Sequence, residues 1–180
     1  TYLIAGATMG DITLNNCKPK HLEDIINKLK LSGANISSTE NSLSIEKIDS
    51  VEAVDMTTEV YPGFPTDLQA QWMAFMSIAK GKSTIIDTVY HDRFTHIPEL
   101  NRLGADIRLK DNKAIVNGVN KLTGAQVMST DIRASAALIL GAIIAEGKTE
   151  ISRVYHIDRG YDSIEKKFQS LGADISRINE

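Results

Sequence analysis

Three stretches of the chain are apolar on almost every side of the helix that their composition favours. They run from Tyr2 to Met9, from Leu68 to Ala79 and from Ile132 to Ala145. A helix without a polar face belongs in a protein interior. We therefore expect three buried helices, and we interpret Trp72 and Met73 on the second helix as core residues.

A second kind of segment alternates with these helices and occurs three times. Each copy predicts a short strand, an amphipathic helix, a glycine turn and a further strand. The first copy illustrates the helix, because apolar residues recur at helical spacing from Leu22 to Leu31. Gly33, Gly104 and Gly172 stand where a helix commonly ends on a glycine. The repeats span about residues 1–50, 61–120 and 124–180.

This alternation predicts an α/β (α+β) fold with pseudo-threefold symmetry. Three buried helices would form the inside, and three strand-bearing units would form sheets on the outside. A length of 180 residues is enough for one sizeable core or for two small ones. Because the three units form one threefold pattern, we expect one domain over residues 1–180. Because the sequence starts with Thr1 inside an apolar run, we expect it to be a portion of a longer chain.

Composition narrows the classes of function. The chain is 42% hydrophobic and 24% charged with a net charge of −3, which is typical of globular proteins and gives no basic surface for nucleic acid. No apolar run reaches the roughly 18 residues of a membrane span. The single cysteine, Cys17, excludes an internal disulfide and fits a reducing compartment. Nothing in the sequence indicates a cofactor or a metal site.

The segment from Tyr61 to Asp67 leads into the second buried helix. Its two prolines and its glycine favour a non-helical entry. We interpret Thr66 as a helix N-cap and Gln69, three residues on, as its partner in a capping box. Asp67 would lie in the first turn, where the helix macrodipole favours a negative charge. Taken alone, Asp67 is an ordinary helix-start residue.

The third buried helix opens in the same way, and this repetition is informative. Thr130 is again interpreted as an N-cap, and Asp131 and Arg133 follow it. The loops after the first strands of copies two and three both carry an aromatic residue, a His, an Asp and an Arg. The arginines are Arg93 and Arg159. The first copy lacks this polar set, so copies two and three look specialised.

We expect the helix N-termini and these loops to meet on one face, which would bring together five charged side chains: Asp67, Asp131, Arg93, Arg133 and Arg159. Such a face suits an anionic substrate, since helix N-termini and arginines both bind anions. A carboxylate among these cations could accept a proton from a hydroxyl. The alternative is that each arginine serves structure by pairing with a neighbour: Arg93 with Asp92, Arg133 with Asp131 and Arg159 with Asp158.

Five stretches resemble signatures of one enzyme family, the UDP-N-acetylglucosamine enolpyruvyl transferases, within the wider EPSP synthase-like group. They are residues 61–71, 93–100, 122–128, 130–135 and 155–161. The resemblance covers essentially the whole chain, more weakly over the first fifty residues. The related enzymes that act on a shikimate ester share the repeat fold, but their signatures differ from these.

The resemblance implies an inverse α/β barrel-like domain of three repeats that makes up most of the second domain of a two-domain enzyme. The implied reaction moves the enolpyruvyl group of phosphoenolpyruvate onto the 3′-hydroxyl of UDP-N-acetylglucosamine through a tetrahedral intermediate and releases phosphate. It is the first committed step of peptidoglycan synthesis in the bacterial cytoplasm, on which cell shape and division depend. No cofactor is implied.

The implied partners are the two small-molecule substrates and the missing N-terminal domain, with no nucleic acid and no membrane. That domain carries the family's catalytic cysteine, whose loop the residues around Cys17 do not match. We therefore expect this chain alone to be inactive. Two alternatives remain: a related transferase with another acceptor, such as shikimate 3-phosphate, and a non-catalytic anion-binding module.

The resemblance also implies roles for individual residues. The catalytic residues would be Asp67, Asp131 and Arg159. Asp67 would contact the 3′-hydroxyl and act as its base, and Asp131 would lie close to the reacting carbon. The remaining implied roles concern binding: the backbone of Val89 holds the nucleotide sugar, and the side chains on the phosphoenolpyruvate side are Arg93, Arg133 and Arg159. Arg159 would move as the two domains close.

Overall fold

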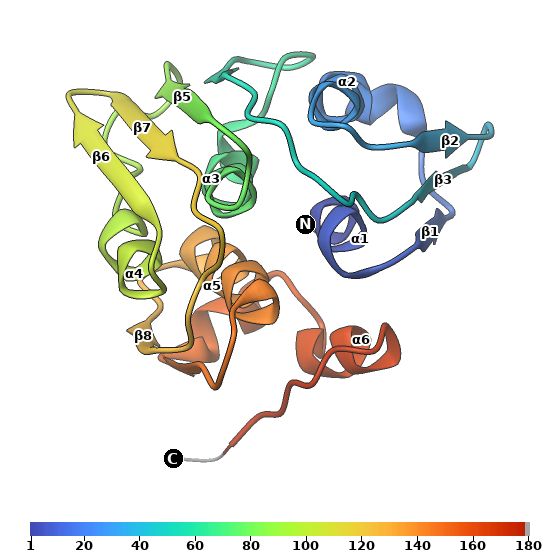
Figure 1. Ribbon diagram of the computed structural model, residues 1–180. Helices are drawn as coiled ribbons and strands as arrows, with labels where there is room; N and C mark the ends of the chain where they lie inside the picture. Colours follow the sequence, from blue (N-terminus) through green and yellow to red (C-terminus); the bar gives the residue numbers. More distant parts are fainter. Residues whose placement is uncertain (179–180) are drawn as a thin grey trace.

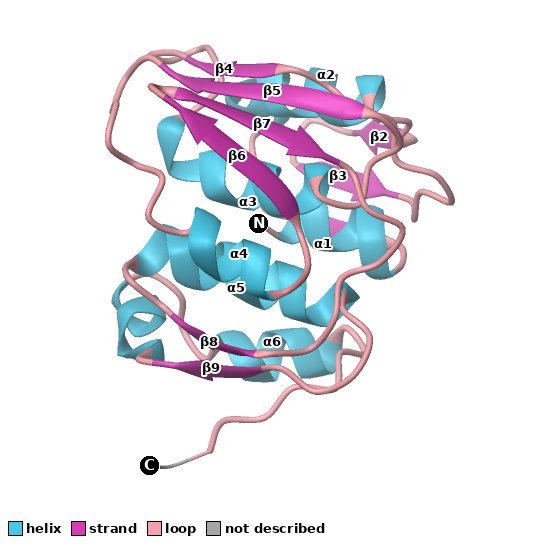
Figure 2. Ribbon diagram, turned by 60° about the vertical axis from the view of Figure 1, so that its left-hand side comes forward, coloured by secondary structure: helices cyan, strands magenta, loops and turns pink. Residues whose placement is uncertain are grey.

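The three apolar helices form the interior of the molecule, as predicted (Figure 2). The computed structural model describes residues 1–178 of the 180-residue chain. The helices are α1 (Tyr2–Met9), α3 (Gln69–Met76) and α5 (Ile132–Ile144), and each contacts the other two. Every residue of α3 is buried, which explains why its sequence has no polar face.

Three separate sheets surround these helices, each built mainly from one unit of the sequence (Figure 1). In the first sheet β1 (Ile12–Asn15) and β2 (Ile36–Ser38) flank β3 (Ser42–Ile45). The second sheet contains β4 (Met56–Thr58), β5 (Lys82–Asp87), β6 (Asp106–Lys110) and β7 (Lys113–Asn117), in the spatial order β4-β5-β7-β6. The third sheet pairs β8 (Gln126–Met128) with β9 (Glu150–Ser152). The predicted α/β fold with helices inside and sheets outside is confirmed.

Each unit also has a second helix, which follows a strand in the chain. These helices are α2 (Glu23–Leu31), α4 (Ile97–Arg102) and α6 (Ile164–Ser170), with the 3₁₀ turns η1 (Pro19–Leu22), η2 (Thr66–Leu68) and η3 (Val154–Arg159). On α2, Ile25 and Leu29 are buried, as the helical spacing predicts. Gly33, Gly104 and Gly172 follow these helices with φ of 103°, 91° and 92°. This left-handed conformation is nearly strain-free only for glycine, and the prediction of helix ends there is confirmed.

Two short strands that the sequence pattern did not predict orient the buried helices. β4 pairs in parallel with β5, and α3 lies between them in the chain; β8 pairs in parallel with β9 around α5 in the same way. In such a unit the helix starts near the carboxyl ends of both strands. The first turns of α3 and α5 therefore lie beside the loops that follow β5 and β9.

Two predictions about helix starts are wrong. Thr66 does not cap α3: it lies in η2, its hydroxyl donates to Asp87 Oδ2 at 2.6 Å, and no capping box with Gln69 forms. Thr130 does not cap α5, because Asp131 is the N-cap and Oδ1 accepts from the amides of Arg133 and Ala134. A carboxylate at this position also interacts favourably with the positive end of the helix dipole.

The last strand predicted for the third unit is also absent. In the second unit the strand after the glycine, β6, is held by hydrogen bonds to its antiparallel neighbour β7. Residues 173–178 have no such partner strand within the described part of the chain and form no strand. A strand needs a neighbour for its backbone groups, so the sequence pattern alone could not decide this.

Close backbone contacts also hold the second unit together. A Cβ at Gly118, which follows β7, would lie 1.6 Å from the carbonyl oxygen of Ala79 after α3. The Gly118 amide also donates to the carbonyl oxygen of Gly81 at 2.9 Å. Only glycine lets these two segments approach so closely.

Among the described residues, no helix is both long and apolar enough to cross a membrane.

Candidate active site

The charged residues singled out in the sequence come from elements that meet at the carboxyl ends of the parallel strands. Asp67 lies in η2, directly before α3, and Arg93 lies in the loop after β5. Asp131 and Arg133 begin α5, and Arg159 ends η3, which follows β9. The parallel pairing therefore explains how residues from two repeats reach one side of the domain.

Asp67 is held between two arginines. Its Oδ1 lies 3.0 Å from Arg93 Nη1 and 3.4 Å from Arg133 Nη1. The Asp67 side chain is 74% exposed, whereas those of Arg93 and Arg133 are 16% and 27% exposed. The two largely buried cations thus hold a carboxylate that is exposed to solvent. A carboxylate held in this way can contact an incoming ligand.

Asp131 links the capped helix to this cluster. Its Oδ1 accepts from the Arg133 amide at 2.7 Å and lies 3.5 Å from Arg133 Nε. Asp131 and Arg133, together with Arg159 and His156, line an open pocket of about 490 Å³. Two of these side chains are arginines, so the pocket is chemically suited to a small polar anion.

Arg159 does not pair with its neighbour Asp158. Asp158 is bound by Arg177, whose Nη1 and Nη2 donate to its two carboxylate oxygens at 2.9 and 2.7 Å. Within residues 1–178 no carboxylate forms an ion pair with Arg159. The structural alternative of neighbouring pairs is therefore wrong for Arg159, and it is wrong for Arg93, which binds Asp67 and not Asp92. It holds for Arg133, which does contact Asp131.

Asp87 is a component of the site that sequence reasoning missed. It ends β5, is fully buried, and accepts hydrogen bonds from Thr58, Thr66 and the amides of Val89 and Tyr90. Burial alone would raise the pKa of Asp87, but these hydrogen bonds together hold it below the usual value. The available signal was an acidic residue at the end of the predicted strand, directly after Ile85 and Ile86.

Val89 lies beside this carboxylate and is 42% exposed. Its amide is already bonded to Asp87 Oδ1 at 3.0 Å. A ligand that contacts the Val89 backbone would therefore meet the carbonyl oxygen.

Within residues 1–178, no three His, Cys, Asp or Glu side chains are grouped so that they could hold a metal ion.

His96 is a second component that the sequence did not single out as a site residue. It is 2% exposed and precedes α4. Burial lowers the pKa of His96 to about 4; the negative charge of Asp131 opposes this change and the positive charge of Arg133 adds to it. The imidazole of His96 is therefore neutral at physiological pH.

Residues 1–168 match the family model described as EPSP synthase (3-phosphoshikimate 1-carboxyvinyltransferase). The chain belongs to the EPSP synthase family. The resemblance inferred from the sequence motifs is thereby confirmed at the level of the family.

Individual curated proteins share about half of their aligned residues with this chain. It is 52% identical over 178 residues to the UDP-N-acetylglucosamine 1-carboxyvinyltransferase of Chlorobium chlorochromatii, and the match covers 98% of this chain and 42% of that protein. It is 52% identical over 180 residues to the enzyme of the same name from Bdellovibrio bacteriovorus, covering 99% and 44%. The chain thus spans less than half the length of the curated relatives it matches.

Solved structures of the family support the fold. The enolpyruvyl transferase NikO from Streptomyces tendae matches with a TM-score of 0.88 at 24% identity, over 97% of this chain and 42% of that one. EPSP synthase from Acinetobacter baumannii matches with a TM-score of 0.70 at 15% identity, over 98% and 42%. At these identities the likeness concerns the arrangement of helices and sheets and not the ligands.

Proposed function

We propose that the chain is part of an enzyme that transfers the enolpyruvyl group of phosphoenolpyruvate to the 3′-hydroxyl of UDP-N-acetylglucosamine and releases phosphate. The observation that carries this proposal is the solvent-facing carboxylate of Asp67, held between Arg93 and Arg133 beside the pocket that contains Arg159. The identity of about 50% to proteins named for this activity supports the choice of substrates.

In the proposed reaction Asp67 is the general base. Its exposed oxygen takes the proton of the 3′-hydroxyl as the hydroxyl oxygen bonds to C2 of phosphoenolpyruvate, while a proton added at C3 completes a tetrahedral adduct. Elimination then breaks the bond between C2 and the phosphate oxygen, and the departing phosphate takes up the proton held by Asp67. A C3 proton returns to the acid that supplied it, which restores the double bond. Contact with Arg93 and Arg133 keeps the Asp67 side chain in position for the first step.

The arginines bind the negative charges of phosphoenolpyruvate. A guanidinium fork matches a carboxylate or a phosphate in two parallel hydrogen bonds. Arg133 and Arg159 line the same pocket, so they could bind two groups of one small substrate. Asp131, which lines that pocket with them, would lie close to the reacting carbon. The Val89 carbonyl would accept a hydrogen bond from the nucleotide sugar.

The remaining parts of the account concern the whole protein. We infer that this chain is most of the second domain, and that the first domain supplies the acid that protonates C3 and closes over the substrates. The chain alone would then be inactive. The complete enzyme would act in the bacterial cytoplasm at the first committed step of peptidoglycan synthesis, and so contribute to cell shape and division.

One experiment tests the reaction and the acceptor together. Phosphate release from phosphoenolpyruvate is measured with the complete parent protein, offered either UDP-N-acetylglucosamine or shikimate 3-phosphate. We expect release only with the nucleotide sugar. Release only with the shikimate ester, the acceptor in the description of the matching family model, would overturn the acceptor assignment. No release with either would return the site to the alternative of a non-catalytic anion-binding module.

A further inference from the structure

Asp87 is a buried carboxylate for which the proposed reaction has no step. Its Oδ1 accepts from Thr58 Oγ1 at 2.7 Å, from the Val89 amide at 3.0 Å and from the Tyr90 amide at 2.8 Å. Its Oδ2 accepts from Thr66 Oγ1 at 2.6 Å. An isolated buried charge is costly, but four donors compensate it here. The contacts therefore tie the strand end, η2 and the loop after β5 to one group.

The bond to Thr66 sets the direction of the next interaction. A hydroxyl has one hydrogen, and that of Thr66 is given to Asp87, so a lone pair remains for Arg93 Nη1 at 3.1 Å. The same nitrogen donates to Asp67 Oδ1 at 3.0 Å. The hydrogen bonds thus run without interruption from the buried carboxylate to the exposed one.

A second route reaches the same guanidinium. Arg93 lies over the ring of Tyr90 with its Cζ 4.4 Å from the ring centre. The Tyr90 amide is bonded to Asp87, so this carboxylate fixes the backbone that places the ring. A cation held over an aromatic face is attracted by it. Asp87 therefore constrains Arg93 from two sides, through a hydroxyl and through an aromatic ring.

We propose that Asp87 is a positioning residue that holds Arg93 against Asp67 and turns the Val89 carbonyl toward the nucleotide sugar; this role rests on the proposed function. Asp87 itself is fully buried, so a substrate bound at the surface of the domain would not touch it. Its effect on transfer passes through Thr66 and through the turn at Val89 and Tyr90.

The test replaces Asp87 and Thr66 in the complete parent protein. Asp87→Asn keeps the shape and one acceptor oxygen, but presents an N–H to Thr66, whose own hydrogen must then point toward Arg93. We expect kcat/KM for the nucleotide sugar to fall about 10- to 100-fold, the worth of a hydrogen bond to a charged group. Thr66→Val should give a similar loss, Thr66→Ser should restore activity, and the double variant should be no worse than Asp87→Asn.

A matched control separates positioning from stability. Asp106 is a carboxylate at the other end of the same sheet, where it accepts from Asn117 at 2.8 Å. Asp106→Asn should leave kcat/KM unchanged. Melting temperatures and amide exchange at Val89 and Tyr90 are recorded for every variant, and faster exchange at these amides is expected only when Asp87 is replaced.

The outcomes distinguish this role from the proposed function. A wild-type parent that does not transfer the enolpyruvyl group overturns the proposed function and the role of Asp87 with it. If the wild type transfers and Asp87→Asn transfers equally well, only the role of Asp87 is overturned. The same holds if Thr66→Val and Thr66→Ser are equally active, because the hydroxyl would then carry no positioning effect.

Discussion

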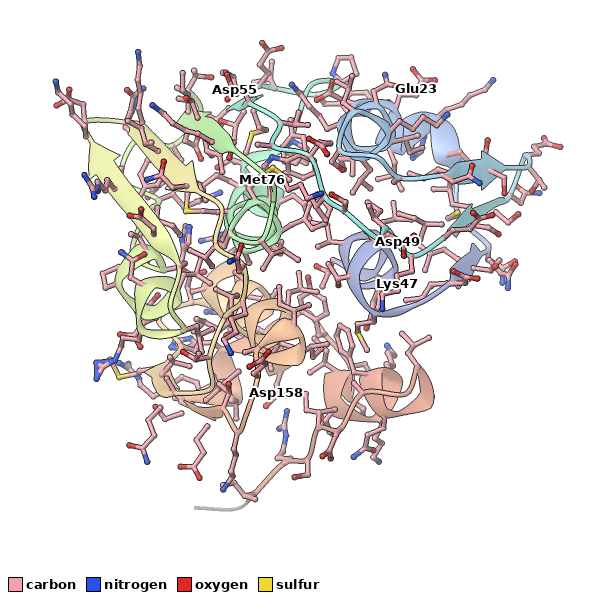
Figure 3. The ribbon with its side chains drawn as sticks, in the orientation of Figure 1. Glu23, Lys47, Asp49, Asp55, Met76 and Asp158 are labelled. Atoms are coloured by element: carbon pink, nitrogen blue, oxygen red, sulfur yellow. The ribbon has the colours of Figure 1, made fainter. Side chains whose placement is uncertain are left out.

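Asp158 forms a bidentate ion pair with Arg177 and does not pair with its neighbour Arg159. Arg177 lies 19 residues further along the chain, in the segment that follows α6, and its Nη2 also lies 3.4 Å from Glu165. Asp158 faces this segment (Figure 3). The hydrogen bonds from Arg177 hold the pKa of Asp158 below its usual value. The pairing leaves Arg159 available to the pocket.

Removal of the ion pair between Arg177 and Asp158 should impair use of phosphoenolpyruvate. In Arg177→Ala the carboxylate of Asp158 is released and can pair with Arg159, which would compete with the substrate. Because both side chains are partly exposed, we expect KM for phosphoenolpyruvate to rise by no more than about fivefold. Steady-state kinetics of the parent enzyme measure this. Adding Asp158→Asn should bring KM back, and failure of that rescue would argue against competition for Arg159.

Arg159→Ala should affect the reaction and not the fold. Arg159 is exposed and forms no ion pair within residues 1–178, so its loss should change the free energy of unfolding by less than about 0.5 kcal/mol. KM for phosphoenolpyruvate should rise about 10- to 100-fold, as expected for a lost charged hydrogen bond. Arg153→Ala, at an exposed arginine of the same segment, is the control. A variant that loses stability alone would make Arg159 structural.

A methyl group at Gly118 should disrupt the contact between the second sheet and α3. The added Cβ would lie 1.6 Å from the Ala79 carbonyl oxygen, so one of the two backbones must shift. We expect Gly118→Ala to lower the free energy of unfolding by about 3 kcal/mol. Gly10→Ala is the control, because its Cβ would meet nothing within 4 Å and its φ is 165°. Chemical denaturation measures both, and equal midpoints would contradict the contact.

The structure also predicts a dependence of stability on pH. His96 has a pKa of about 4 in the folded chain against 6.5 when solvated, so the unfolded chain binds the extra proton between these values. The contribution of His96 to stability is therefore complete above pH 6.5 and lost as pH falls toward 4, at up to about 1.4 kcal/mol per pH unit. His96→Gln should flatten this slope, whereas replacement of the exposed His21 should not.

The sequence predicts the framework of the fold well because its strongest signals are local. An apolar helix such as α3 and a glycine turn such as Gly104 require no knowledge of distant residues. The strands β4 and β8 have three residues each, too few to show a period, and their parallel partners lie beyond a buried helix. They could not be read from local pattern.

In the candidate site, too, local signals could be predicted from the sequence and long-range contacts could not. Repetition of Asp and Arg at matching points of two units predicted that Asp67, Arg93 and Arg133 would meet, and they do. The prediction that Thr66 caps a helix is wrong because Asp87, 21 residues away, takes its hydrogen. The partner of a polar side chain is a long-range property, so the sequence suggested the charged face but not the buried carboxylate beneath it.

The most direct test of the central claim, that Asp67 is the base, is phosphate release by the parent enzyme carrying Asp67→Asn. The variant keeps the size of the side chain but cannot accept the proton of the 3′-hydroxyl. With phosphoenolpyruvate and UDP-N-acetylglucosamine we predict a fall in kcat of about 10²- to 10⁴-fold. Asp92→Asn, at an exposed carboxylate one residue before Arg93, should release phosphate at the wild-type rate. Near wild-type release by Asp67→Asn would contradict the claim.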